Sequence, residues 1–260
     1  MWNKERETRT SERIGREWTA TLARVTGCVL DLVYPPGCIS CGARLEGGEE
    51  GALCEGCRKQ LPLIGRYRCP RCGDELGPYT AGARACPSEC RRKTLYFRGA
   101  VAVCRYEGVA RDLVQQLKYR GDLRAATWMG RMMLDRLRSM EWLASCDCVV
   151  PVPLHWSRRL GRRFNQSELL ARAIAEPVAL PVSRSALART KRTSAQATLA
   201  YPERARNVKG AFRAREDAAV NGRRILLVDD VMTTCATAAE CARALLKAGA
   251  ASVHVAVFGR

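Results

Sequence analysis

The feature that most constrains this chain is a set of four close cysteine pairs, which use eight of the 14 cysteines in its 260 residues. Two or three residues separate the members of a pair, so both thiolates can point at one ion. Two such pairs complete the four-thiolate tetrahedron of a closed structural zinc site. The pairs therefore predict two structural zinc ions and no catalytic metal. The predicted ligands are Cys38, Cys41, Cys54, Cys57, Cys69, Cys72, Cys86 and Cys90.

Pairing neighbours in sequence gives two zinc ribbons, although the spacing alone also allows an interleaved pairing. The second ribbon is expected to have the looser geometry, because three residues separate Cys86 from Cys90. Gly42 and Gly73 directly follow the second cysteine of their pairs and fit the tight turn of a zinc knuckle. The remaining cysteines are scattered, and most are expected to be buried small hydrophobic residues. They are Cys28, Cys104, Cys146, Cys148, Cys235 and Cys241.

The N-terminal stretch favours a reducing compartment. Arg24 and Asp31 interrupt its most apolar part, residues 21–34, and no small-residue cleavage site follows, so no secretory signal is predicted. The stretch is also too short and too charged to span a bilayer. Its helical spacing predicts an amphipathic helix packed on the protein, with a membrane anchor as the less favoured alternative. We therefore expect a cytoplasmic protein without membrane insertion, in which clustered cysteines bind metal.

Positive charge is in excess and unevenly distributed. Lys and Arg total 44 against 26 Asp and Glu, a formal net charge of +18, which makes polyanions the natural partners. The alternative is a charge excess that serves only solubility. Clustering favours phosphate binding. One cluster contains Arg158, Arg159, Arg162 and Arg163, and a second contains Arg189, Lys191 and Arg192.

After Lys93 the composition changes, and strand and helix patterns alternate as in an α/β domain. The predicted organisation is an amphipathic helix in 1–35, a double zinc ribbon in 36–94 and the α/β domain in 95–260. A half-exposed strand is expected at 99–106, a buried strand at 148–152 and an extended segment at 182–187. Helices are expected at 109–118, 123–137, 167–175 and near Pro202. The clearest pattern is a final βαβ unit, with strands at 225–228 and 253–258 around a helix at 238–247 closed by Gly249.

The loop between the first strand and the helix of that unit carries the chemistry. In open α/β sheets ligands bind at this point. Backbone N–H groups of the first helical turn and the hydroxyls of Thr233, Thr234 and Thr237 are suited to a phosphate. Asp229 and Asp230, just before them, are suited to ribose hydroxyls or to positioning Mg²⁺. The alternative is a capped helix start that follows an acidic loop.

The two acidic residues and the Thr-rich run resemble the phosphoribosyl-pyrophosphate (PRPP) motif of type I phosphoribosyltransferases. Further segments, together with the cysteine pairs, are similar to the ComF/GntX family from about Pro36 to the end of the chain. Those segments are Pro151-Val152-Pro153-Leu154, the Arg-rich stretch, Phe164-Asn165-Gln166, Gln196 and Asn207-Val208-Lys209-Gly210.

The resemblance implies a type I phosphoribosyltransferase-like parallel sheet with helices on both faces. It implies that PRPP binds with Mg²⁺ and that its 5′-phosphate lies on Thr233, Thr234, Cys235, Ala236 and Thr237. Asp229 and Asp230 would hold the ribose, and the arginines from Arg158 to Arg163 would hold the pyrophosphate.

For function, the resemblance implies an accessory factor in DNA uptake and natural competence that binds PRPP and single-stranded DNA, with a DNA-uptake helicase as a partner. The alternative is an active phosphoribosyltransferase that transfers phosphoribosyl from PRPP to an unknown base in nucleotide metabolism. Two positions depart from the family, which usually has Gly at Cys235 and often at Arg163. A side chain at Cys235 opposes positive φ and predicts weaker PRPP binding, while the adjacent helix N-terminus predicts a lowered thiol pKa.

Overall fold

A computed structural model describes residues 37–45, 51–77, 86–87, 90–154, 164–191, 206–215 and 220–260. The chain divides into two compact units, Met1–Cys54 and Glu55–Arg260, and the second contains all the strands named below. Several sequence predictions fall outside the described residues. They are the amphipathic helix with Cys28, the helix near Pro202, the arginine cluster Arg158, Arg159, Arg162 and Arg163, and the single residues Arg192 and Gln196.

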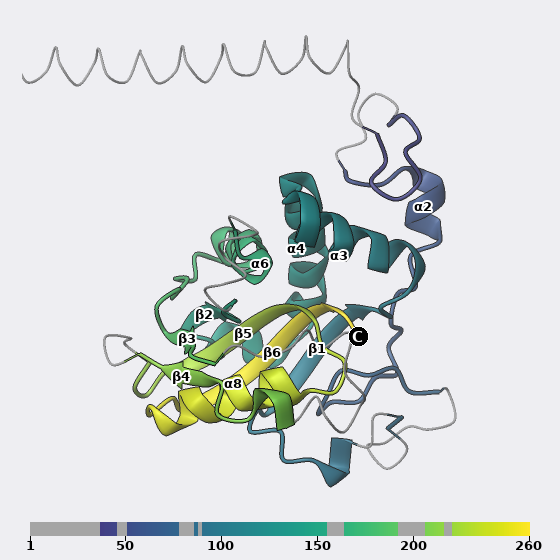
Figure 1. The fold of residues 1–260 in the computed structure, drawn as a ribbon. Helices are drawn as coiled ribbons and strands as arrows, with labels where there is room; N and C mark the ends of the chain where they lie inside the picture. Colours follow the sequence, from purple (N-terminus) through teal and green to yellow (C-terminus); the bar gives the residue numbers. More distant parts are fainter. Residues whose placement is uncertain are drawn as a thin grey trace, which may run out of the picture. The chain divides into compact units, whose positions relative to one another are not determined.

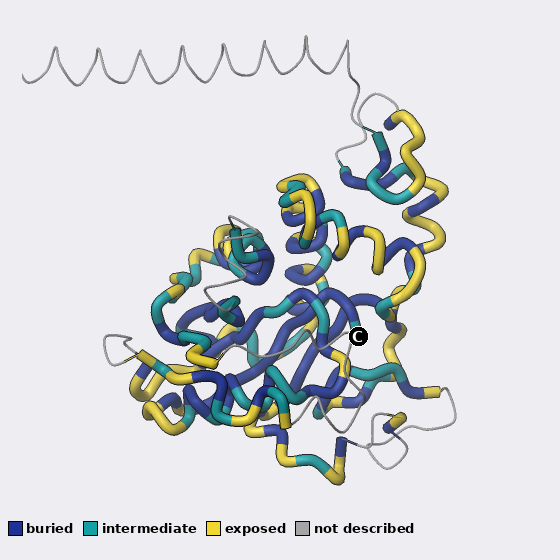
Figure 2. The backbone as a smooth tube through the Cα atoms, viewed as in Figure 1, coloured by how far each residue is buried: buried dark blue, intermediate teal, exposed yellow. Residues whose placement is uncertain are grey.

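A parallel sheet of four strands forms the centre of the second unit, in the order β1-β6-β5-β2 (Figure 1). The strands are β1 (Gly99–Cys104), β2 (Cys148–Pro151), β5 (Arg224–Val231) and β6 (Ser252–Gly259). Their register aligns Val149 of β2 with Leu226 of β5, and Leu226 with His254 of β6. Strands β1, β2 and β6 are buried along their whole length, as expected for a parallel sheet covered on both faces (Figure 2).

Helices cover both faces of this sheet, which confirms the predicted fold class. Helices α3 (Gly108–Arg120), α4 (Leu123–Arg138) and α6 (Gln166–Ala175) lie on one face, and α8 (Ala236–Lys247) lies on the other (Figure 1). Each helix presents an apolar stripe at intervals of three and four residues to the sheet, because a surface helix must bury one side. In α4 the fully buried residues Met129, Met133 and Leu137 form that stripe.

The prediction that residues 99–106 form a half-exposed strand is wrong, because all six residues of β1 are buried. One face of β1 packs against α4. On the other face Ala100 and Ala102 share a core with the cysteines of the second cluster. The approach is close at Gly73, whose φ is +72° and where a Cβ atom would lie 3.1 Å from the carbonyl oxygen of Ala100. The zinc ribbon therefore supplies the cover that the strand pattern alone could not reveal.

The remaining elements are short. Strands β3 (Leu187–Arg189) and β4 (Phe212–Ala214) form a small antiparallel sheet. The extended segment predicted at 182–187 is only a single parallel bridge from Val182 to Val149, and the strand itself starts at Leu187. The helical turns are α2 (Glu55–Lys59), η2 (Cys90–Arg92), η3 (Glu141–Ser145) and η4 (Glu176–Val178). No helix in the described part of the chain has the length and apolar character needed to cross a lipid bilayer.

The predicted βαβ unit is present, with β5 and β6 parallel and α8 between them in sequence. Strand β5 is longer than predicted, because its pairing with β6 continues to Val231 opposite Gly259. Asp229 and Asp230 therefore lie on the end of a strand and not in a loop. Successive side chains of a strand point to opposite faces of the sheet, so the carboxylates of Asp229 and Asp230 point in different directions.

Candidate phosphate-binding site and metal centres

Both cysteine clusters assemble as sequence neighbours, so the interleaved pairing is wrong. In each cluster the four sulfur atoms lie within 4.8 Å of one another. Tetrahedral zinc–sulfur bonds of about 2.3 Å place sulfur atoms about 3.8 Å apart, which is close to this arrangement. In the second cluster the distances are 3.3 Å from Cys72 Sγ to Cys86 Sγ and 3.5 Å from Cys69 Sγ to Cys90 Sγ. Both donor sets fit structural zinc.

The predicted knuckle turns are also present. The amide of Gly42 donates to the carbonyl of Cys38 at 2.9 Å, and the amide of Gly73 donates to the carbonyl of Cys69 at 2.8 Å. Both glycines have positive φ, which side chains oppose. Of the six cysteines outside the pairs, the five that the structure describes are all buried, as predicted. They are Cys104, Cys146, Cys148, Cys235 and Cys241, while Cys28 lies outside the described residues.

The two adjacent aspartates have different surroundings. Asp229 lines a small hollow formed by the loop that follows β5. Its Oδ1 accepts hydrogen bonds from Ser167 Oγ at 2.8 Å and from the amide of Asp230 at 2.9 Å. Burial, together with the neighbouring charge of Asp230, raises the pKa of the Asp229 carboxyl to about 7. The surroundings of Asp229 thus disfavour its ionised form.

Asp230 is 4% exposed and forms an ion pair with Lys118 of α3, with 3.1 Å between Nζ and Oδ2. Burial by itself would lower the pKa of Lys118, but the charge and hydrogen bond of Asp230, together with the charges of Tyr106 and Asp229, outweigh this and raise it. Binding of a ribose hydroxyl through Asp230 would require this ion pair to open, whereas Asp229 already faces the hollow.

The loop from Met232 to Thr237 wraps around the start of α8. The hollow it forms holds about 20 Å³, room for one water-sized group such as a phosphate oxygen. Thr234 Oγ1 accepts a weak hydrogen bond of 3.4 Å from the amide of Ala236. Cys235 occupies the helix N-cap with φ of +67°, in the left-handed region that favours glycine. The chain therefore keeps the backbone shape for which glycine would be preferred, although it carries a side chain there.

The predicted lowering of the Cys235 thiol pKa is wrong. The thiol is buried and lies in hydrogen-bond contact with Cys72 of the second cluster, and this contact and burial together raise its pKa. A helix N-terminus is a local signal, while the contact with Cys72 comes from a segment more than 150 residues earlier in the chain. Cys235 is therefore a packing residue in the described structure.

Arg260 joins the same loop to the second cluster. Its Nη1 donates to the carbonyl oxygens of Met232, at 2.7 Å, and of Thr233. Its Nη2 lies 3.7 Å from Oδ2 of Asp74, two residues after Cys72, and the side chain is 2% exposed. Arg260 and Cys235 thus connect the candidate phosphate loop to the zinc ribbon.

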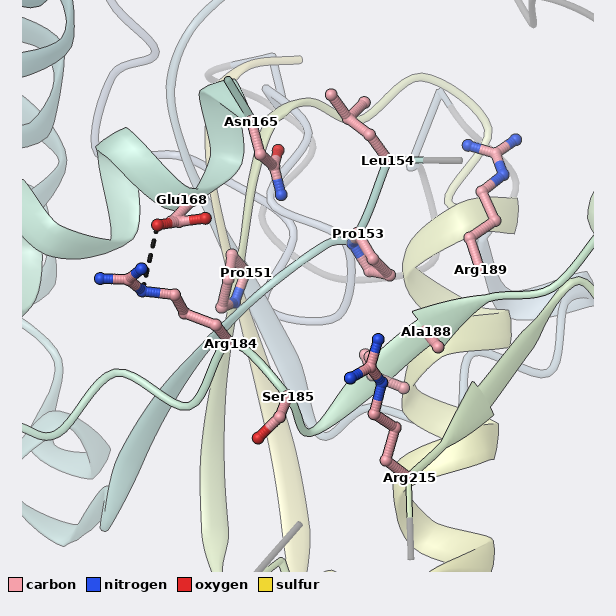
Figure 3. Close-up of a pocket in the computed structure, with 11 residues that line it drawn as sticks. Pro151, Pro153, Leu154, Asn165, Glu168, Arg184, Ser185, Ala188, Arg189 and Arg215 are labelled. Atoms are coloured by element: carbon pink, nitrogen blue, oxygen red, sulfur yellow. Dashed lines mark ion pairs between the residues drawn. The ribbon is translucent and has the colours of Figure 1, made fainter. Parts of the chain in front are cut away.

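A second pocket, of about 290 Å³, lies at the carboxyl end of β2 (Figure 3). Figure 3 shows Glu168 and Arg184 facing each other on one side of the pocket. Nε of Arg184 lies 3.1 Å from Oε1 of Glu168. Asn165 stands at the start of α6, where its side chain donates to the carbonyl of Val152 at 3.1 Å and accepts from the amide of Ser167. Acidic, basic and amide groups around one pocket suit a small polar molecule.

The structure brings the predicted loop residues together and separates the other basic residues. Asp229, Thr233, Thr234, Cys235, Ala236 and Thr237 line one hollow. Arg189 lines the pocket beside β2, while Lys191 lines a different and larger groove. The predicted pyrophosphate arginines fall in the interval between Leu154 and Phe164 that is not described.

Three residues of the site escaped the sequence analysis. Ser167 binds Asp229, Lys118 binds Asp230, and Arg260 holds the loop carbonyls. Ser167 directly follows the Asn165-Gln166 segment that carries the family resemblance, which was a usable signal. Lys118 stands four residues after the buried Val114, so it is a cation at apolar-stripe spacing.

Comparison with protein families matches two models. A double zinc ribbon domain matches residues 29–91, and a phosphoribosyl transferase domain matches residues 161–259. These matches agree with the two cysteine clusters and with the position of the βαβ unit described above.

Comparison with individual proteins gives relatives that match this chain over 80% to 96% of their own length. The DNA utilization protein YhgH of Escherichia coli (strain K12) is 35% identical over 228 residues, 86% of this chain and 96% of that protein. Competence protein F of Haemophilus influenzae is 29% identical, over 84% of this chain and 94% of that protein. Competence protein ComFC of Bacillus subtilis is 29% identical, over 77% and 80% respectively.

Proposed function

Because this chain belongs to the ComF family and joins a double zinc ribbon to a phosphoribosyltransferase domain, we propose that it binds PRPP and single-stranded DNA as an accessory factor in DNA uptake. The relatives' names indicate a role in DNA utilisation and competence. The same proposal places the protein in the cytoplasm, with a DNA-uptake helicase as a partner. Residues 95–260 would form the PRPP-binding domain and 36–94 the double ribbon.

The observation that carries PRPP binding is the loop at the end of β5. It combines a helix N-terminus, three threonines and a left-handed N-cap position with a carboxyl group that faces the hollow. Backbone N–H groups and the helix dipole attract a phosphate dianion at such a point. We assign the 5′-phosphate to Thr233–Thr237 and a ribose hydroxyl to Asp229. The ion pair of Asp230 with Lys118 supports the strand end behind it.

Mg²⁺ would accompany the pyrophosphate of PRPP and neutralise part of its charge. Asp229 is the carboxylate that faces the ligand side, so it is the protein group best placed to help position the ion. The arginines Arg158, Arg159, Arg162 and Arg163 would meet the pyrophosphate.

Calorimetric titration of the full chain with PRPP and Mg²⁺ tests this proposal. Asp229→Asn keeps the size of the side chain but removes its charge. A hydrogen bond to a charged group contributes about 1.5–3 kcal/mol, so PRPP binding should weaken about tenfold to a hundredfold. Asp135→Asn, on the exposed surface of α4, is the matched control and should leave the affinity unchanged. Absence of PRPP binding by the natural chain would refute the proposal.

A second candidate function is phosphoribosyl transfer, and the pocket beside β2 is the observation that favours it. With about 290 Å³ of space it lies next to Asn165, two residues from the Ser167 that binds Asp229. A nucleophile held there would be close to the anomeric carbon of a bound PRPP. Release of pyrophosphate from PRPP, measured with candidate bases and with DNA, distinguishes an enzyme from a binding protein.

A further inference from the structure

A groove with about 1,160 Å³ of space lies on the α8 side of the sheet. Its walls come from four parts of the second unit. They are residues 93–96, which follow the second cysteine cluster, Lys191, the segment 206–210, and the loop end and first half of α8 between residues 234 and 243. This volume is about four times that of the pocket in Figure 3 and exceeds the usual range for a single small ligand. The groove therefore suits an extended ligand.

Positive charge dominates the groove. Five cationic side chains line it, together with one carboxylate, that of Glu240. Glu240 is already engaged, because it binds Arg243 at 2.6 Å and accepts from the amide of Gly210 at 2.6 Å. It adds little repulsion against an anion. The cations are Lys93, Lys191, Arg206, Lys209 and Arg243.

The groove is also partly apolar and carries an exposed aromatic residue. Buried Leu95 and Val208 contribute to its lining. Tyr96 lines it as well, is 46% exposed and has φ of +58°, a conformation that a bulky residue adopts only where the surroundings impose it. The wall is anchored to the second ribbon, since Arg71 donates to the carbonyl of Lys93 at 3.3 Å. A basic groove with an exposed aromatic side chain is the arrangement that holds single strands, with phosphates on the cations and a base stacked on the ring.

We propose that this groove binds a segment of single-stranded nucleic acid, with its phosphates on Lys191, Arg206 and Lys209 and a base stacked on Tyr96. This inference rests on the proposed function in DNA uptake and names the surface that would hold the strand. Thr234, Cys235 and Ala236 line both this groove and the hollow of the phosphate loop. A bound strand therefore touches the same loop as PRPP.

Fluorescence anisotropy with a labelled oligothymidylate and the full chain tests the assignment. Arg206→Gln with Lys209→Gln removes two cations from the groove. The slope of log affinity against log salt should fall by about 1.4, because each phosphate contact to a single strand contributes about 0.7. Tyr96→Leu should weaken binding about tenfold, with a smaller change in the salt slope. The matched control is Arg111→Gln with Arg120→Gln, which removes two exposed cations from α3 on the opposite face of the sheet.

If the groove variant and the α3 control lose DNA affinity and salt slope equally, the assignment of DNA to the groove is overturned. The proposal that the protein binds DNA would still stand. No binding by the natural chain would refute the DNA part of the proposed function itself.

Lysine acetylation of the natural chain, read by mass spectrometry, decides the matter even if a variant misfolds. Oligothymidylate should protect Lys191 and Lys209 at least threefold more than Lys247 on the last turn of α8. Protection by PRPP alone, and none by the oligonucleotide, would show that the groove takes a small ligand and would also overturn the proposal. Protection of Lys247 equal to that of the groove lysines would do the same.

Discussion

The two cysteine clusters have the same chemistry but different places in the molecule. In the first cluster Cys41 is exposed and Cys54 is half-buried, while all four cysteines of the second are buried. The second cluster belongs to the core that contains β1, β5, β6 and α8, and no described cysteine of the first does. Cysteine spacing thus predicts a metal site without telling whether that site is peripheral or part of a domain core.

The largest expected difference comes from deleting one ligand in each cluster. Cys41→Ser and Cys72→Ser should each lose about one zinc ion per chain. Only Cys72→Ser should destabilise the unit from Glu55 to Arg260, by more than about 3 kcal/mol, because zinc binding there is coupled to folding of the core. Zinc analysis and hydrogen exchange of peptides from β5 and β6 measure the two effects. Equal destabilisation by both substitutions would erase the distinction between the clusters.

Chelation should separate the clusters in time. The exposed Cys41 gives a chelator a route to the first ion, whereas the second ion lies behind buried sulfur atoms. We expect two phases of zinc release that differ at least about tenfold in rate, since the slow phase requires opening of the core. Cys72→Ser should retain only the fast phase. A single phase in the natural chain would contradict the expected order.

Replacing Arg260 tests the connection between the second cluster and the phosphate loop. Arg260→Met leaves the carbonyl oxygens of Met232 and Thr233 without this donor, which should cost about 1–3 kcal/mol of unfolding free energy. PRPP binding should weaken as well, because the loop loses its support. Arg44→Met, an exposed position in the first unit, is the control and should change neither quantity. Denaturant unfolding measures the stability and calorimetry measures PRPP binding. If Arg260→Met is as stable as the natural chain, the hydrogen bonds of Arg260 to the loop do not contribute to stability.

The smallest effect is expected at Cys235. Cys235 has the left-handed φ that the phosphate loop requires, so the strain of this φ falls on folding and not on PRPP binding. Cys235→Gly should therefore change PRPP affinity less than about threefold, since only a difference in strain between the free and the PRPP-bound protein affects binding.

Cys235→Ala separates strain from the contact with Cys72. The alanine variant loses the thiol but keeps the strain, so it should be about 1 kcal/mol less stable than the glycine variant. Thermal unfolding of the two variants side by side measures this difference. A glycine variant no more stable than the alanine variant would show that the loop is unstrained.

Sequence predicted the local features of this molecule and missed those that depend on distant contacts. Ligand pairing within a knuckle and the apolar periodicity of 225–258 are local, and the structure confirms both. Burial of β1 could not be predicted, because its cover comes from the cysteine segment and not from its own pattern.

At the candidate site the same limit applies. The loop residues Asp229 to Thr237 follow each other in sequence, so their grouping was predictable. Ser167 and Lys118 reach the aspartates only through the packing of α6 and α3 on the sheet. The direction in which the pKa of Cys235 shifts depends on Cys72, and no local sequence pattern links Cys72 to the loop.

The small side chains of β1 set a limit on how this protein can be divided or recombined. Ala100 and Ala102 are small where the second ribbon lies against the strand, and at Gly99 a Cβ atom would come within 2.9 Å of the carbonyl of Pro70. A fragment starting at Leu95 would uncover this apolar face at the edge of the sheet and should self-associate. The second ribbon and the phosphoribosyltransferase domain therefore cannot be cut apart without exposing their shared core.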